Sequence, residues 1–208
     1  QKYLPTSCKK ILIISDYSAP IWGIETHIQG SIGALCTNGY EVHTLFALKG
    51  ENRYIRYLWL LFSSVNIWFA FRLWWKIRQY QPDAIWVHSE VRCIGPLGLL
   101  PLLKFSGCLI KTYHDLGYFG AFPTQFTSES QLKSTRHFVD FFQRSKGIHR
   151  YFLLHIFAKF CQIQAIRSIL WTRWVHIVPS EFMIPAAQGF VTPMAQVVKI
   201  SHFSPHHP

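Results

Sequence analysis

The most constraining feature of this sequence is a strand-like run followed closely by a helix-like one. Residues 11–14 form an apolar run short enough for a buried strand, and Ile28, Ile32 and Leu35 recur at helical spacings of three and four. The loop between them holds one proline, Pro20, and one glycine, Gly23. The free amides and the positive dipole end of the helix would face that loop, which suits an anionic ligand. An ordinary strand-to-helix turn explains the same pattern.

The alternation of strands and helices continues along the chain. We expect strands at 10–15, 41–47, 83–88, 108–114, 175–178 and 196–200, and helices at 25–37, 54–80, 95–105, 131–143 and 150–170, with Ser180 capping a further short helix. Strands separated by helices predict an α/β fold, a Rossmann-like and mostly parallel sheet with helices on both faces. Ligands of such sheets bind at the carboxyl ends of the strands, near the switch in strand order.

Four groups of polar residues follow predicted strands at this edge. They are Asp16 with Glu25 and His27, His88 with Glu90, His114 with Asp115, and Ser180 with Glu181. A single histidine after a strand is more often a capping or packing residue, but several polar groups at one edge favour a binding site. His114 is the first candidate, because its imidazole could donate a hydrogen bond to a phosphate or a sugar hydroxyl, or accept a proton.

The positive charge of the chain is concentrated in two segments. The net charge is +11, with five basic residues and no acid in 53–78 and eight basic residues and one acid in 133–173. Basic residues interleaved with Trp, Phe and Leu favour an anionic membrane surface or a phosphate-bearing substrate. Nothing in the sequence has a nucleic-acid-binding signature, so we expect no nucleic-acid partner.

The cysteine pattern and the known motifs argue against a resident metal or cofactor. The five cysteines are odd in number and have no CxxC spacing, which is typical of buried thiols in a reducing compartment. No zinc, calcium or P-loop spacing occurs, and no GxGxxG follows the first strand. We therefore expect neither a metal nor a dinucleotide cofactor.

The predicted helix 54–80 leaves three alternatives open. Its segment 57–71 has no charged residue, but a membrane span needs roughly 20 apolar residues. Trp59, Trp68, Trp74 and Trp75 favour a helix that lies in the membrane interface. Its place between two predicted strands favours a core helix, and a true span is the third reading.

In combination, these pieces resemble the N-terminal domain of GT-B glycosyltransferases of the GT4 type. The matching segments are ILIISDYSAPIWGIETHI near the start, NGYEVHTLFA, PDAIWVHS, KTYHD, and VHIVPSEFM followed by QGF and VVKI. The resemblance extends over nearly the whole chain, and the order and spacing of the segments are more specific than any one of them. It implies one half of a GT-B fold and the transfer of a sugar from a nucleotide diphosphate sugar, usually with retention and without a bound metal.

The resemblance also implies roles for individual residues. His114 maps to the active-site histidine of the family. Asp115, the acid that follows His114, is the second catalytic candidate on its position alone. Gly23 maps to the loop near the donor phosphates and the acceptor, with Glu25 and His27 opening the next helix. The remaining candidates for substrate or phosphate binding are Asp16, His88, Glu90, Ser180 and Glu181.

The expected organisation is a single Rossmann-like domain over 1–200, with 201–208 starting a linker or tail and a donor-binding C-terminal domain absent from the chain. The expected partners are a sugar acceptor, which can be lipid-linked, an anionic membrane surface contacted through 53–78 and 133–173, and a separate donor-binding domain or subunit. We expect a cytoplasmic, peripheral place at the inner face of a membrane. The alternatives are a non-catalytic subunit that anchors a donor-binding partner at the membrane and a regulatory nucleotide-binding module.

Overall fold

A computed structural model describes residues 8–18, 23–48, 66–90, 93–114, 161, 165, 174–181, 183–190 and 196–200. Its elements are, in chain order, β1 (Lys10–Tyr17), α1 (Gly23–Thr37), β2 (Glu41–Leu48), α3 (Ile67–Tyr80), β3 (Ala84–Ser89), α4 (Gly95–Gly98), the 3-10 helix η2 (Leu100–Lys104), β4 (Cys108–Thr112), β5 (Trp174–Val178), α8 (Met183–Phe190) and β6 (Gln196–Lys199). The predicted helices 131–143 and 150–170 lie outside the described residues, apart from Cys161 and Ala165, which are helical.

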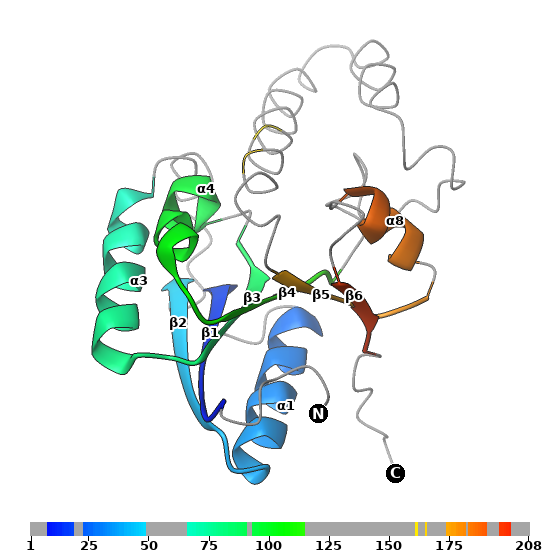
Figure 1. The fold of residues 1–208 in the computed structure, drawn as a ribbon, viewed down its shortest axis with the longest axis horizontal. Coiled ribbons are helices and arrows are strands. Elements are labelled where there is room, and N and C mark those ends of the chain that lie inside the picture. The colour runs from blue at the N-terminus through cyan, green and yellow to red at the C-terminus, as the bar shows by residue number, and fades with distance from the viewer. Residues whose placement is uncertain are drawn as a thin grey trace.

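The six strands form one parallel sheet in the order β2-β1-β3-β4-β5-β6 (Figure 1). This confirms the predicted α/β, Rossmann-like fold. The chain passes from β1 to β2 on one side and then crosses to β3 on the other side of β1. The strand order therefore switches between β1 and β3, which is where ligands bind in open parallel sheets.

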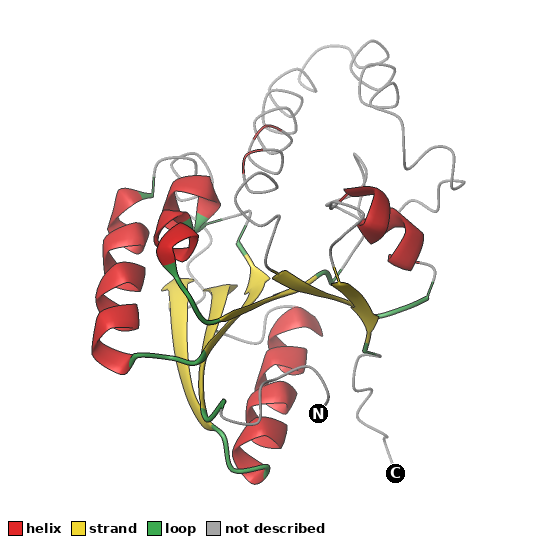
Figure 2. Ribbon diagram, viewed as in Figure 1, coloured by secondary structure: helices red, strands yellow, loops and turns green. Residues whose placement is uncertain are grey.

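Helices cover both faces of the sheet (Figure 2). Ile11 and Ile13 of β1 are buried on the face covered by α1, together with Ile28 of that helix. Leu12 and Ile14 are buried on the opposite face. Because both faces of the strand are covered, its sequence reads as a continuous apolar run rather than an alternating one.

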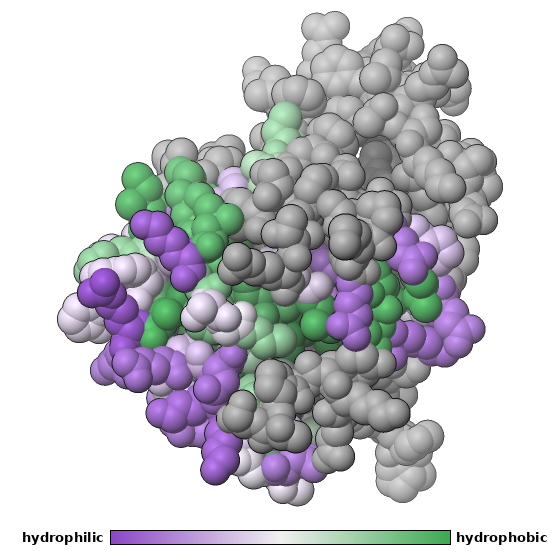
Figure 3. Space-filling model, viewed as in Figure 1, coloured by the Kyte–Doolittle hydropathy of each residue, from purple (hydrophilic) through white to green (hydrophobic). Residues whose placement is uncertain are grey.

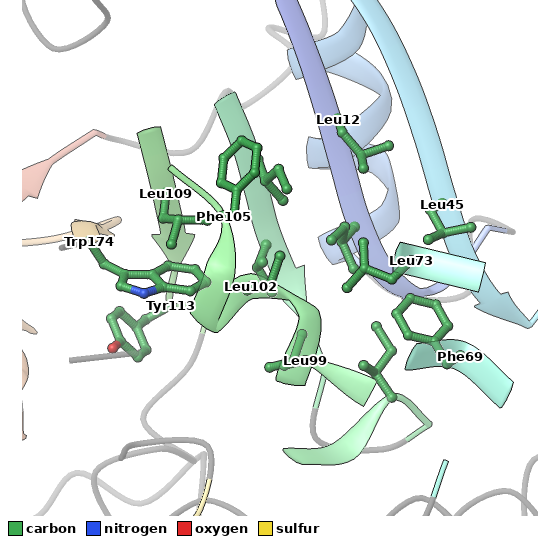
Figure 4. Close-up of a cluster of buried hydrophobic side chains, with 14 of the residues drawn as sticks. Leu12, Leu45, Phe69, Leu73, Leu99, Leu102, Phe105, Leu109, Tyr113 and Trp174 are labelled. Atoms are coloured by element: carbon green, nitrogen blue, oxygen red, sulfur yellow. The ribbon is translucent and has the colours of Figure 1, made fainter. Parts of the chain in front are cut away.

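The larger core lies between the sheet and the helices α3, α4, η2 and α8 (Figure 4). Phe69 and Leu73 of α3 pack there with Leu12 and Leu45 from the strands, and Leu99 lies beside them. At the other end of the cluster, Leu102, Leu109, Tyr113 and Trp174 are buried together. This core extends along β3 and β4 up to their carboxyl ends.

The expected continuous helix over 54–80 is wrong at Asn66. Asn66 is the N-cap of α3, with non-helical backbone angles, and its side-chain oxygen accepts a hydrogen bond from the Phe69 amide at 2.9 Å. An asparagine that bonds its own downstream backbone favours a helix start over a helix interior. Residues 54–65 of that prediction lie outside the described residues.

Other element boundaries also differ from the prediction. The expected helix 95–105 is divided into the short α4 and the 3-10 helix η2, which contains Pro101, because proline cannot donate the amide hydrogen bond that an unbroken helix requires. β1 continues through Asp16 to Tyr17, and β4 ends at Thr112, before His114. α8 begins at Met183, whose amide donates a hydrogen bond to the backbone carbonyl of Ser180 at 3.2 Å. The side-chain cap by Ser180 stays a prediction.

None of the helices that the structure describes combines the length and the apolar character needed to cross a bilayer. α3 is buried on one face only, through Phe69, Leu73 and Tyr80. Its other face is exposed, so α3 is not a core helix enclosed by protein.

Candidate functional site

Polar side chains meet at the carboxyl edge of the sheet, around the switch between β1 and β3. Asp16 lies near the end of β1, His88 and Ser89 end β3, and His114 follows β4 by two residues. Because adjacent parallel strands end at the same edge, residues far apart in sequence become neighbours here. Three of the sequence candidates, Asp16, His88 and His114, are therefore brought to one place.

Three histidines form the centre of this site. The Nδ1 atom of His88 lies 3.0 Å from Nε2 of His114, a hydrogen-bond distance. The His27 ring reaches them from α1, with ring centroids 5.8 Å from His88 and 5.4 Å from His114. His88 is buried and His114 is half-buried, so His114 is the member of the pair with access to a ligand. A hydrogen bond between two imidazoles requires a donor on one ring and an acceptor on the other.

Trp86 supports the His88 ring from within the same strand. Its ring centroid lies 4.6 Å from that of His88, and its indole nitrogen donates a hydrogen bond to the Thr112 hydroxyl at 2.7 Å. Thr112 is on β4, two residues before His114. The indole therefore joins β3 to β4 directly beneath the imidazole pair.

Asp16 acts as a buried acceptor that fixes the turn after β3. Its carboxylate accepts hydrogen bonds from the amides of Cys93 and Ile94 at 2.8 and 3.0 Å and from the Ser89 hydroxyl at 2.8 Å. Hydrogen bonds to an ionised carboxylate are stronger than those between neutral groups. Asp16 thus holds the carboxyl end of β3 against β1 and fixes the backbone of the turn that follows β3.

Glu90 is also buried, and its partner is a lysine that the sequence analysis did not select. The Lys111 ammonium donates to Glu90 Oε2 at 2.6 Å and to the His88 carbonyl at 2.8 Å, and both side chains of the ion pair are fully buried. Lys111 lies on β4, and its two hydrogen bonds hold the end of β3 in place. Removal of one partner of such a pair leaves a buried charge and typically costs about 3–5 kcal/mol. The signal that could have found it is a lone lysine within an apolar strand.

A second residue that the sequence analysis missed is a histidine on β5, the strand next to β4. His176 on β5 is fully buried, with its Nδ1 atom 3.0 Å from the Tyr113 hydroxyl and the two rings stacked at 5.7 Å. Burial, and then the nearby positive charge of Lys111, lowers the pKa of His176 to about 4. The imidazole is therefore neutral at physiological pH, and its Nε2 atom has no hydrogen-bond partner among the described residues.

The remaining sequence candidates lie at the edge of this site or beyond it. Gly23 and Glu25 lie in the first turn of α1, and His27 follows on the same helix. The side chain of Glu25 and the whole of Asp115 lie outside the described residues. Ser180 and Glu181 follow β5, one strand beyond β4. The Glu181 carboxylate is exposed and accepts a hydrogen bond from Lys199 at 2.7 Å, and this bond lowers the pKa of Glu181.

Within the described part of the chain, no three His, Cys, Asp or Glu side chains form a group that could hold a metal ion. Comparison of the chain with protein-family models and with curated proteins finds no match. The described groups of the site can form hydrogen bonds and can transfer protons through imidazole, beside the N-terminal half of α1.

Proposed function

We propose that this chain is the acceptor-side domain of a glycosyltransferase resembling the GT4 type, acting in glycan or polysaccharide biosynthesis. The donor would be a nucleotide diphosphate sugar, with no further cofactor, and the acceptor a sugar hydroxyl, which can belong to a lipid-linked molecule. The observation that carries the proposal is the contact between His88 and His114, at 3.0 Å, beside the strand switch and the N-terminal half of α1. The order of the sequence segments that resemble the family supports it independently.

The proposed chemistry needs a proton acceptor at the acceptor hydroxyl. A bond forms between the acceptor oxygen and the anomeric carbon of the donor sugar, and the bond from that carbon to the nucleoside diphosphate breaks. In this proposal His114 contacts the reacting sugar, with Asp115 beside it, and takes part in moving the hydroxyl proton. His88 holds the His114 ring, and the amides at the start of α1, near Gly23, Glu25 and His27, face the departing diphosphate.

The donor nucleotide is assigned to a second domain or to a partner chain. This part of the proposal comes from the resemblance, in which a separate Rossmann-like domain binds most of the nucleotide sugar. The carboxyl edge of the sheet would face that domain, with Ser180 and Glu181 at its far side. The proposed place of action is the cytoplasmic face of a membrane, supported by the aromatic side chains exposed on α3 and by the basic residues of the same helix.

The direct test is a turnover assay of a protein that contains this chain together with the donor-binding domain or partner chain. Release of nucleoside diphosphate would be measured with a set of nucleotide diphosphate sugars and a membrane lipid extract as the acceptor. His114→Ala is expected to lower kcat by roughly 100-fold or more, since general acid–base groups typically contribute that much. His43→Ala is the matched control, because His43 lies on β2 and stacks on Tyr80 away from the site.

Two results would overturn the proposal. One is full activity of the His114→Ala protein, which would exclude a role for that imidazole in the reaction. The other is the absence of nucleoside diphosphate release with every donor sugar, provided that the protein is folded and the lipid extract supports a known glycosyltransferase in parallel.

A second candidate function is a non-catalytic subunit that holds a donor-binding partner at a membrane. The observation that favours it is the exposed aromatic surface of α3, which such a subunit would need even if the histidine site were unused. Detectable turnover of a nucleotide diphosphate sugar by the 208-residue chain alone would exclude this candidate.

A further inference from the structure

The two site histidines, His88 and His114, meet in the geometry of a directed hydrogen bond. Their facing nitrogens, Nδ1 of His88 and Nε2 of His114, are 3.0 Å apart. The ring planes differ by only 23° and the ring centroids are 5.2 Å apart, so both nitrogens lie close to the line that joins the ring centres. The ring N–H of one histidine can therefore aim directly at the lone pair of the other.

This contact limits how many protons the two rings can hold together. With both rings neutral, one nitrogen donates and the other accepts. One added proton turns the contact into a charge-assisted hydrogen bond, which is shorter and stronger than a neutral one. A second added proton would leave two donors facing each other at 3.0 Å, with no acceptor and with two positive charges. The geometry is thus suited to one added proton and opposed to two.

The charges around the two rings also favour one added proton. The described titratable side chains that pack around them, directly or through one further residue, are Asp16 from β1, His27 from α1, Glu90 after β3, Lys111 from β4 and His176 from β5. Lys111 and Glu90 neutralise each other at 2.6 Å, and the His176 imidazole is neutral at physiological pH. His27 can only add positive charge. The carboxylate of Asp16 balances one proton, and a second would have no counter-charge among these residues.

Trp86 holds the His88 ring in this geometry. Side chains alternate along β3, so Ile85 and Val87 enter the core on one face of the sheet, and Trp86 and His88 share the other face. The indole centroid lies 4.6 Å from that of His88, and the indole N–H donates to the Thr112 hydroxyl at 2.7 Å. Because the face of an indole attracts a cation, Trp86 also favours an imidazolium at His88.

We propose that His88 and His114 act as one acid–base unit that holds a single added proton, with Trp86 as its positioning residue. A proton taken up by His114 is shared across the contact with His88, which is buried and stabilises the positive charge away from solvent. Trp86 acts through the His88 ring and not on a ligand. Neither histidine therefore works alone.

The use of this unit in sugar transfer rests on the proposed function. In that reaction the O–H bond of the acceptor hydroxyl breaks and an N–H bond forms on His114. The electron pair of the hydroxyl oxygen forms the bond to the anomeric carbon, and the nucleoside diphosphate leaves with the electron pair of the bond that breaks. The positive charge on His114 is shared with His88, and the proton passes to solvent after the products leave.

Nitrogen NMR of the histidine rings in the 208-residue chain counts the protons and requires no turnover. Between about pH 8 and about pH 5 an isolated imidazole changes from nearly neutral to nearly fully charged. We expect the signals of His88 and His114 to move together over this range, one proton to be taken up in total, and a nitrogen–nitrogen coupling to cross the contact. Two independent titrations that take up two protons, or the absence of the coupling, would overturn the proposal.

Three substitutions test the positioning role of Trp86. Trp86→Leu removes the indole, Trp86→Phe keeps an aromatic ring without its N–H, and Thr112→Val removes only the acceptor of that N–H. The coupling should be lost in Trp86→Leu and weakened to a similar extent in the other two variants. An unchanged coupling in all three would overturn the positioning role. Thermal unfolding verifies that each variant is folded, and the two conservative variants carry the test if Trp86→Leu does not fold.

Trp75→Phe is the matched control for these variants. Trp75 is 57% exposed on α3, the helix whose mixed hydrophilic and hydrophobic surface lies at the left of Figure 3. Among the described rings it contacts Trp74 and none of the site histidines. Its replacement removes an indole N–H from the protein but should leave the coupling between His88 and His114 unchanged.

Turnover by the protein that also contains the donor-binding domain or partner chain gives an independent test. His88→Ala and His114→Ala should each lower kcat by roughly 100-fold, and the double variant should lie within about twofold of either, since the two rings form one unit. Losses that multiply to roughly 10,000-fold would overturn the proposal. Trp86→Phe should lower kcat about tenfold and leave KM within about twofold. A wild-type protein without turnover would overturn the proposed function, whereas the NMR titration would still decide whether the proton is shared.

Discussion

Several polar side chains near the candidate site are buried, and one of them, His176, has a strongly lowered pKa that makes the stability of the fold depend on pH. Its pKa falls from 6.5 to about 4, first because burial disfavours the imidazolium and then because Lys111 is nearby. The unfolded chain would bind a proton at pH values between these two numbers, and the folded chain would not. The folded state is therefore progressively disfavoured as the pH falls from 6.5 towards 4.

This gives a pH-dependent stability prediction. Between about pH 7 and pH 5, His176 should remove about 2 kcal/mol from the free energy of unfolding. In His176→Asn, which retains an acceptor for the Tyr113 hydroxyl, the decline over that interval should be smaller by about the same amount. Urea unfolding at the two pH values measures the difference. Equal declines in the two proteins would show that His176 titrates alike in the folded and unfolded chains.

The two described carboxylates whose pKa values are lowered do not obscure this interval. The backbone amides of Lys9 and Lys10 lower the pKa of Asp83, and Lys199 lowers the pKa of Glu181. The stability contributed by a carboxylate with a lowered pKa is lost only as the pH falls through its unfolded value and below, which for these groups is more acidic than pH 5.

At the scale of the element, the length of α3 is set by the residues at its two ends. Asn66 caps the first turn and also donates to the Cys93 carbonyl at 2.6 Å, which ties the helix to the turn held by Asp16. At the other end, Gln81 adopts a left-handed conformation with φ of 49° and its amide bonds Ile77, before Pro82. The helix length thus follows from one capping side chain and one terminating turn, as well as from apolar periodicity.

Two substitutions separate the two functions of Asn66. Asn66→Ala removes the cap and the bond to Cys93, and should lower the free energy of unfolding by about 2 kcal/mol. Asn66→Ser retains a capping oxygen but loses the reach to Cys93, so it should cost about 1 kcal/mol. Denaturant unfolding of the two variants measures both values. Equal losses would mean that the cap contributes nothing beyond the contact with Cys93.

At the scale of the whole molecule, the sheet is unevenly protected. β1 is buried along almost its whole length and is paired on both sides, whereas β6 is an edge strand with exposed ends. Local opening is easiest where few apolar contacts hold a segment. The centre of the sheet, which carries Asp16 and His88, should therefore be its most stable part.

Amide hydrogen exchange tests this order. The amides of residues 11–14 should be among the last to exchange, close to the limit set by global unfolding, and those of β6 should exchange much earlier. Mass spectrometry of peptic peptides resolves the two strands. Equal protection of β6 and β1 would contradict this account of the sheet and would indicate that the molecule opens as one unit.

The sequence by itself determined the class of fold and the edge at which the polar residues gather. Apolar runs and helical spacings are local properties, so they predicted an α/β sheet and put His88 and His114 at or just beyond the carboxyl ends of strands. They could not predict the break at Asn66, since the cap acts together with a contact to Cys93, 27 residues away.

Only the tertiary structure decided which of these side chains meet. The pairing of Lys111 with Glu90, the stacking of Tyr113 on His176 and the approach of His27 to the other two histidines all join residues from different elements. These contacts follow from the strand order and from the face that each residue occupies. Local periodicity gives the face but contains no information about which strand becomes the neighbour.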